Sequence, residues 1–258
     1  MSNLDLVKKI RQATGAGMSD INKALVEANG DEAKAVEILR KAGQKIAAKK
    51  ADREIKEGTI VFAEADGKLA VVALGCETDF VARNPDFIAQ VQELADELLK
   101  RGKDDFSTWA NDKIQNDLIV KIGENLQLVK FDLIESAIMG SYLHSNRKVA
   151  SVVTLKSGTK EIARDVAMHA AAMAPKYLQP EEVPAELLDK EKEIYTEQLK
   201  NEGKPEAMWE KIMPGKVAKF YSDVCLLKQA YVKDDKQSIE QYLKANNAEI
   251  DKYFYFSL

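Results

Sequence analysis

The sequence predicts an α+β fold, in which helices and antiparallel pairs of strands occupy separate stretches of the chain. Three observations predict this fold class. Apolar residues recur at helical spacing through the first 43 residues, strand-like runs flank Asp66-Gly67, and a polar helical stretch begins at residue 180. The 258 residues are enough for one large domain or several small ones, and a hydrophobic share of 45% is ordinary for a globular protein.

The N-terminal segment is expected to form three short helices. Thr14–Gly17 separates the first helix from the second, and Ser19 or Asp20 is expected to cap the second helix. Asp31 is expected to cap the third helix, and Gly43 is expected to stop it. A bundle of this size lies near the lower limit for independent folding.

Residues 44–57 are rich in Ala and Lys and are expected to be a partly helical linker. Two interpretations stay open. The basic residues Lys45, Lys49, Lys50 and Arg53 could form an arm that binds RNA or the ribosome, or they could belong to a solvated connector. The net charge of −4, from 38 basic and 42 acidic residues, argues against nucleic acid as the main partner.

A β-hairpin is expected next, because the apolar runs Thr59–Ala63 and Leu69–Leu74 flank the turn residues Asp66-Gly67. The elements expected after it are a helix over residues 85–101 closed by Gly102, a helix over roughly 108–123 and a strand over 126–131. A strand over 148–156 and a helix over 160–174 repeat this order, which hints at a duplicated α+β unit.

Residues 180–219 are polar and helical, with a thin apolar stripe. Gly203-Lys204-Pro205 divides this stretch, so two antiparallel helices are expected to form a protruding hairpin. The tail is expected to contain a short helix over 238–245 and a terminal strand over 253–256.

The sequence shows no catalytic constellation, and we expect a protein that is not an enzyme. His144 and His169 are the two histidines, and neither has a zinc-ligand spacing. His144 is open to two interpretations, as a polar contact residue in a loop or as a general base. His169 lies on an apolar helix side, where a hydrogen-bonded core histidine is the ordinary interpretation. Phosphate-binding glycine loops are absent from the sequence, so neither a cofactor nor a metal site is expected.

The two cysteines, Cys76 and Cys225, indicate the cellular compartment. They lie far apart in the sequence and belong to no paired motif. This usage suits a reducing compartment without a disulfide framework. The N-terminus lacks an apolar signal region, and apolar runs stay short of the ~20 residues that span a membrane. The expectation is a cytoplasmic protein with no membrane partner.

The most informative stretch is Thr78-Asp79-Phe80-Val81-Ala82-Arg83-Asn84, which connects an expected strand to an expected helix. Phe80 is a large apolar ring in this polar connection. Burial of a Phe side chain is worth roughly 1.5–3 kcal/mol, so the ring is expected to enter either its own core or a partner. Local chemistry alone favours its own core, because buried aromatic rings usually serve packing.

Seven segments spread over nearly the whole chain form an ordered set of motifs, namely Arg11–Met18, Lys23–Leu25, Glu27–Asp31, Thr78–Asn84, Lys121–Asn125, Ser141–His144 and Asp165–His169. In these motifs and in their order the chain resembles bacterial elongation factor Ts. This family is the nucleotide exchange factor for elongation factor Tu, a translational GTPase. The resemblance implies a protein that binds elongation factor Tu and promotes GDP release, acting on the magnesium-GDP of its partner without a cofactor of its own.

The resemblance also implies a domain organisation. The implied parts are a ubiquitin-associated-like three-helix domain and linker over 1–54, an N-terminal half of an α+β core with antiparallel sheets over 55–140, a C-terminal half over 141–179 and 223–258, and an inserted helical hairpin for dimerisation over 180–222.

Particular residues acquire implied roles in partner binding. These are Met18, Thr78, Asp79, Phe80, Val81, Ile122 and His144. Asp79 and Phe80 are expected to reach the nucleotide domain of elongation factor Tu, where the ring would wedge between two helices near the magnesium site. Ile122 and His144 match contact positions in the two halves of the core, and Met18 matches a position that touches a helix of the nucleotide domain.

Two departures from the family pattern stand out. Met213-Pro214-Gly215-Lys216 occupies the place of a motif that usually resembles Val-Glu-Gly-Arg, and the proline is expected to reshape a helix start in the hairpin. Longer members carry a further helix after the last strand, whereas this sequence stops at Leu258. The contact made by that helix is therefore expected to be missing.

Overall fold

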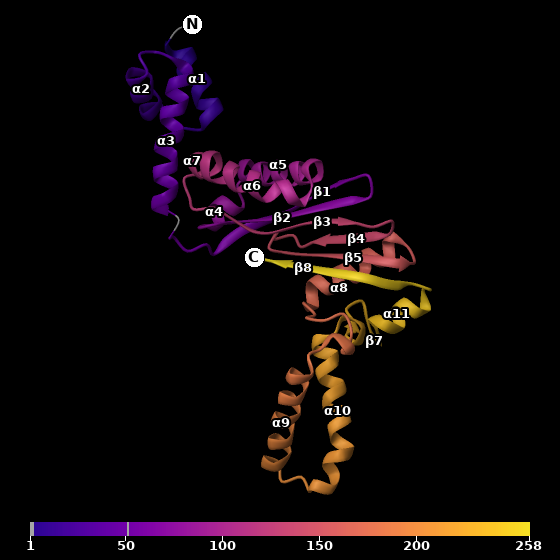
Figure 1. Cartoon of the computed structure of the whole chain (residues 1–258). Coiled ribbons are helices and arrows are strands. Elements are labelled where there is room, and N and C mark those ends of the chain that lie inside the picture. The colour runs from indigo at the N-terminus through magenta and orange to yellow at the C-terminus, as the bar shows by residue number, and fades with distance from the viewer. Residues whose placement is uncertain (1–2, 51) are drawn as a thin grey trace. The chain divides into compact units, whose positions relative to one another are not determined.

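The structure is a computed structural model that describes residues 3–50 and 52–258. The predicted α+β class is confirmed, because helices alternate with antiparallel sheets along the chain (Figure 1). Two compact units are present. The first comprises Met1–Glu135, Ser145–Val149 and Phe256–Leu258, and the second comprises Ser136–His144 and Ala150–Tyr255.

The first unit begins with three helices, α1 (Asn3–Thr14), α2 (Met18–Glu27) and α3 (Glu32–Lys50). They enclose a small apolar core that includes Ile10, Ile21 and Leu39. As predicted, the Asp31 carboxylate caps α3 by accepting a hydrogen bond from the Lys34 amide at 3.1 Å.

Two predictions about these helix ends are wrong. The N-cap of α2 is Gly17 rather than Ser19 or Asp20, and no side chain caps it. Gly43 does not stop α3, which continues to Lys50 through residues of high helix propensity. Gly43 has a packing role instead, since a Cβ there would overlap the side chain of Val120. Residue 51 of the expected linker lies outside the described residues.

An antiparallel sheet follows, with strand order β1 (Glu57–Ala65), β2 (Lys68–Cys76) and β3 (Gln127–Glu135). The predicted hairpin is confirmed. Asp66 and Gly67 both have positive φ, 51° and 74°, which is the type I′ geometry that matches strand twist.

Helices pack against this sheet and enclose the hydrophobic core together with it. They are α5 (Pro85–Arg101), α6 (Lys103–Lys113), the π-helical segment η1 (Ile114–Leu118) and α7 (Ile119–Ile122). The α5 boundaries agree with the prediction, because Asn84 accepts from the Asp86 amide at 2.8 Å and Gly102 ends the helix with φ 76°. The next helix begins at Lys103 instead of near residue 108, since a new helix can start directly at Gly102.

The second unit contains a sheet of order β4 (Met139–Leu143), β5 (Val149–Ser157) and β8 (Glu249–Ser257), with α8 (Lys160–Met173) packed on β4. Strand β4 was not among the strands expected from the sequence. It was missed because it is short and contains Gly140 and Ser141, which have low β-propensity.

The remaining elements of the second unit are η2 (Pro180–Glu182), α9 (Ala185–Asn201), α10 (Glu206–Val224), η3 (Leu226–Lys228), β6 (Ala230–Tyr231), β7 (Asp234–Ser238) and α11 (Ile239–Ala245). Helices α9 and α10 form the predicted hairpin (Figure 1). Pro214 lies inside α10 rather than at a helix start, so the helix lacks one backbone hydrogen bond there. Among the described residues, every helix is too short or too polar to cross a membrane.

Candidate functional site

The stretch Thr78–Asn84 folds as a single helical turn, α4 (Asp79–Ala82), between β2 and α5. Its N-cap is Thr78, whose hydroxyl oxygen accepts from the Val81 amide at 3.4 Å. The Arg83 amide closes the turn on the Asp79 carbonyl at 3.1 Å. The polar connection predicted from the sequence is therefore an ordered turn with its own cap.

Phe80 projects from this turn into solvent. Its exposed fraction is 85%, the highest among the large hydrophobic side chains that the structure describes. Ala82 is buried, and Val81 packs partly against the core of the first unit. The preference of local chemistry for burial of Phe80 in its own core is therefore wrong, because its neighbours on the turn occupy that core.

Asp79 lies beside the ring at the start of the turn. Its carboxylate forms an ion pair with Arg83 at 3.5 Å, in which the Arg83 side chain is largely exposed and the Asp79 side chain is about half exposed. Exposed pairs of this kind contribute little stability, so a partner can replace the Arg83 contact at small cost.

A pair of carboxylates connects the turn to the segment after α7. Glu124 accepts from the backbone amides of Glu77 at 2.9 Å and Thr78 at 3.1 Å, and from the Thr78 hydroxyl at 2.6 Å. Glu77 accepts in return from the Asn125 amide at 2.6 Å. We name this arrangement the carboxylate clasp. The carboxylate clasp could not be predicted from the sequence because its two segments lie more than 40 residues apart, although Glu124 and Asn125 belong to the motif Lys121–Asn125.

The other sequence-predicted contact residues are distributed over both units. Met18 is 52% exposed at the start of α2, and Ile122 is half-buried at the end of α7. The structure brings Ile122 and Val81 together in the lining of one cavity of about 400 Å³. His144 belongs to the second unit, where it follows β4 with its ring 6.4 Å from that of Tyr142.

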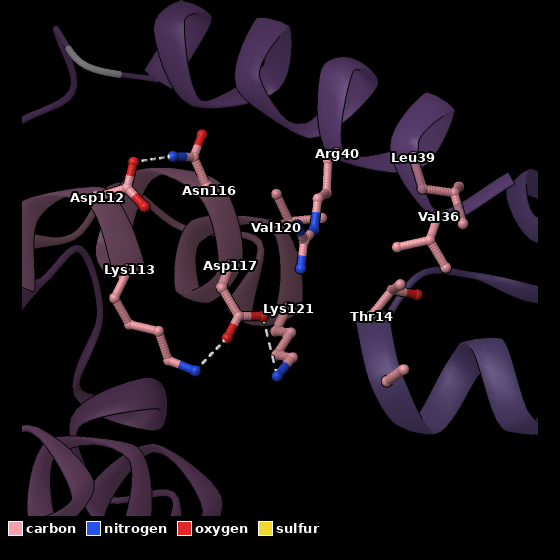
Figure 2. Close-up of a pocket in the computed structure, with 11 residues that line it drawn as sticks. Thr14, Val36, Leu39, Arg40, Asp112, Lys113, Asn116, Asp117, Val120 and Lys121 are labelled. Carbon is pink, nitrogen blue, oxygen red and sulfur yellow. Dashed lines mark hydrogen bonds and ion pairs between the residues drawn. The ribbon is translucent and has the colours of Figure 1, made fainter. Parts of the chain in front are cut away.

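A larger cavity, of about 490 Å³, contains none of the predicted contact residues (Figure 2). Asp117 lines this cavity and pairs with Lys113 at 2.6 Å and Lys121 at 2.9 Å. Burial alone would raise the pKa of Asp117, but the hydrogen bonds from both lysines outweigh burial and lower it. The carboxylate is thus held ionised between two ammonium groups, and its lowered pKa makes it a weaker base than an ordinary carboxylate.

The described residues hold no group of three or more metal-ligating side chains that could bind an ion. Cys76 and Cys225 are buried and free. Burial raises the pKa of the Cys76 thiol to about 12 and that of Cys225 to about 11, so neither forms the nucleophilic thiolate near neutral pH.

Two of the four basic residues of the linker contact other parts of the first unit. The Lys50 ammonium donates to the carbonyl of Gly123, and Arg53 pairs with Glu77 at 3.3 Å. Lys45 and Lys49 are exposed. RNA binding by this linker stays a prediction; filter binding would test it, with a log–log salt slope of about −0.7 to −0.9 per neutralised phosphate.

His169 is a buried core histidine, as the sequence indicates. Its Nδ1 accepts from the Val232 amide at 3.2 Å, so its Nε2 carries the proton and donates to Gln229 Oε1 at 3.0 Å. Burial lowers the pKa of His169 below its ordinary value of 6.5. This ring therefore holds α8 to the segment around β6 only in its neutral form.

We expect stability to fall as the pH is lowered through 6.5 because of His169. Near pH 6.5 the unfolded chain protonates this histidine, whereas the folded chain protonates it only at a lower pH. The free energy of unfolding therefore rises with pH in this range, with a slope of at most about 1.4 kcal/mol per pH unit. Urea unfolding between pH 7.5 and 5.5 measures it. His169→Gln should flatten the dependence, and an equal slope in both proteins would contradict the assignment.

Comparisons with known proteins give one consistent result. Residues 77–258 match a protein family described as Elongation factor TS. A protein named Elongation factor Ts from Hydrogenobaculum sp. (strain Y04AAS1) is 43% identical over 265 residues, covering 98% of this chain and 97% of that protein. Proteins of the same name from Deinococcus deserti and Christiangramia forsetii are 41% and 44% identical, covering 99% and 92% of this chain and 99% and 91% of their own lengths.

Proposed function

This chain belongs to the elongation factor Ts family, and we propose that it binds elongation factor Tu and promotes the release of GDP during translation elongation. The observation that carries the proposal is the placement of Phe80. Its ring is 85% exposed on a capped turn whose other apolar residues face the core. Isolated apolar residues on a surface are ordinary. A largely exposed aromatic ring on an ordered turn in the family's central motif is typical of a binding anchor.

Exchange requires coupling between two binding events and no bond-making. If this protein weakens nucleotide binding to elongation factor Tu by some factor, nucleotide weakens its own binding by the same factor. The Phe80 ring would be buried in a conformation of the partner whose magnesium and phosphate contacts are disturbed. Because a ligand shifts an equilibrium only by its differential affinity, the ring must fit that conformation better than the nucleotide-bound one.

The remaining proposed contacts support the ring. Asp79 would exchange its exposed pair with Arg83 for contacts to the nucleotide domain. Met18, exposed on α2, would contact a helix of that domain, and Ile122 and His144 would supply contacts from the two halves of the core. Thr78 and Val81 would contribute to partner binding as part of the turn that carries Phe80.

The proposed activity uses no catalytic side chain and no cofactor, since it acts on the magnesium-GDP bound to the partner. We place it in the cytoplasm, where translation elongation occurs. The hairpin of α9 and α10, which was expected over residues 180–222, is proposed as a homodimer contact, because Ile194 and Met208 are each 47% exposed on it. Sedimentation at several concentrations would test the dimer.

Release of fluorescently labelled GDP from purified elongation factor Tu tests the main proposal. The chain is expected to accelerate release in proportion to its concentration until the complex saturates. A release rate that is the same with and without this protein would overturn the proposal.

A further inference from the structure

The carboxylate clasp accounts for the geometry of the turn that carries Phe80. A single helical turn is unstable by itself, because nucleation of a helix costs more than one hydrogen bond returns. Turn α4 therefore depends on its packing and on its cap. The cap is Thr78, and the Glu124 carboxylate accepts its hydrogen bonds from Glu77 and Thr78, the residues directly before the turn.

Glu124 determines how the Thr78 hydroxyl is oriented. An ionised carboxylate only accepts hydrogen bonds, so the 2.6 Å contact places the hydroxyl proton on the side of Glu124. A lone pair of the same oxygen then faces the Val81 amide, 3.4 Å away. Without the carboxylate, the hydroxyl would be free to rotate and the cap would be weakened.

The second carboxylate of the clasp, that of Glu77, is also held by several contacts. Glu77 pairs with Arg53 at 3.3 Å and accepts from the Asn125 amide at 2.6 Å. The Asn125 side-chain amide in turn donates to the Arg53 carbonyl at 2.8 Å. Each segment thus gives a carboxylate to the backbone of the other, and the end of the linker is fastened at the same place.

We propose that Glu124 is a positioning residue for nucleotide exchange, which holds α4 so that Phe80 and Asp79 are presented in one preformed arrangement. Glu124 acts through Thr78, and the residues of the turn, rather than Glu124, contact the partner. A preformed arrangement spares the complex the entropy cost of ordering the turn on binding. This inference rests on the proposed exchange function and adds a residue to it.

Glu124→Gln is the principal test, because it keeps the shape of the side chain and replaces one acceptor oxygen by a donor. We expect stimulated GDP release to slow roughly tenfold, as the loss of a charge-assisted hydrogen bond implies. Thr78→Val should slow stimulated release similarly, and Thr78→Ser, which keeps the hydroxyl, should slow it much less than Thr78→Val does.

Glu182→Gln is the matched control. The Glu182 carboxylate also accepts from a backbone amide, that of Leu178 at 2.9 Å, but it lies in the second unit. This substitution should leave stimulated GDP release unchanged. Equal slowing by both substitutions would mean that any lost carboxylate contact impairs exchange, and would overturn the specific role of Glu124.

Two further measurements separate positioning from a merely structural effect. In a Phe80→Ala background, Glu124→Gln should slow release less than twofold further, because the ring that it positions is already gone. Independent multiplication of the two effects would overturn the inference. In the free protein, amide hydrogen exchange at Thr78 and Val81 should be about tenfold faster in Glu124→Gln than in the wild type.

The outcomes distinguish the inference from the proposed function. A wild-type chain that fails to accelerate GDP release overturns the proposed function and the exchange role of Glu124 with it. A wild-type chain that accelerates release, together with a Glu124→Gln variant of equal rate or equal amide protection, overturns the inference alone.

Discussion

Replacing Phe80 with alanine is expected to slow stimulated GDP release from elongation factor Tu by about 10- to 100-fold. Burial of the ring in the partner is worth roughly 1.5–3 kcal/mol, and each 1.4 kcal/mol is a factor of ten. This gain is realised mainly in the conformation that has lost its nucleotide contacts. The rate of GDP release should therefore fall more than the affinity for nucleotide-free partner.

The thermal unfolding midpoint of the Phe80→Ala protein should equal that of the wild type, because a side chain that is 85% exposed loses almost no native contact. Val129→Ala is a matched control, since Val129 is an exposed apolar residue, 44% accessible, on β3. It should leave GDP release unchanged. An unchanged release rate in Phe80→Ala would show that another contact drives exchange.

The elements that could be predicted from the sequence are those specified by neighbouring residues. The turn Asp66-Gly67 between two apolar runs determined the β1–β2 hairpin, and Asn84-Pro85 with Gly102 determined both ends of α5. In each case the side chain or the backbone preference that ends the element lies within the element or next to it. These elements can therefore be predicted without knowledge of the tertiary packing.

The site was predictable only in part, for a physical reason. The motif around Phe80 could be found in the sequence, but the direction of the ring depends on which neighbours fill the core, here Val81 and Ala82. The partner of the Thr78 hydroxyl, Glu124, comes from a segment 46 residues away. No local pattern encodes such a pairing, because it arises from how α7 returns to the end of β2.

Glycines show the same limit. Gly43 was interpreted as a helix stop from its low helix propensity, yet it lies inside α3 facing Val120. Gly140 made β4 harder to predict because of its low β-propensity, yet the backbone of the strand approaches the backbone of α8 closely at this residue. In both cases the absence of a side chain serves contact between elements rather than chain reversal, and single-sequence rules treat all glycines alike.

Gly140→Ala is expected to destabilise the second unit by about 3 kcal/mol. A Cβ at this position would meet the backbone of Ala163 and Arg164, with the Arg164 Cα at 2.6 Å. No side-chain rotation relieves an overlap with helix backbone, so α8 would have to move away from β4. Urea unfolding should show a lower midpoint, and the buried residues of α8 should become less protected from hydrogen exchange.

Gly215→Ala is the matched control, for which we expect a change in stability of the opposite sign. Gly215 lies within α10, and nothing would approach an added Cβ within 4 Å. Alanine is favoured over glycine in a helix interior by about 0.5–1 kcal/mol, so this variant should be slightly more stable than the wild type. Because β4 leads directly to His144, Gly140→Ala should also slow GDP release, whereas Gly215→Ala should not. Equal stability of the two alanine variants would show that β4 and α8 do not pack as closely as the structure describes.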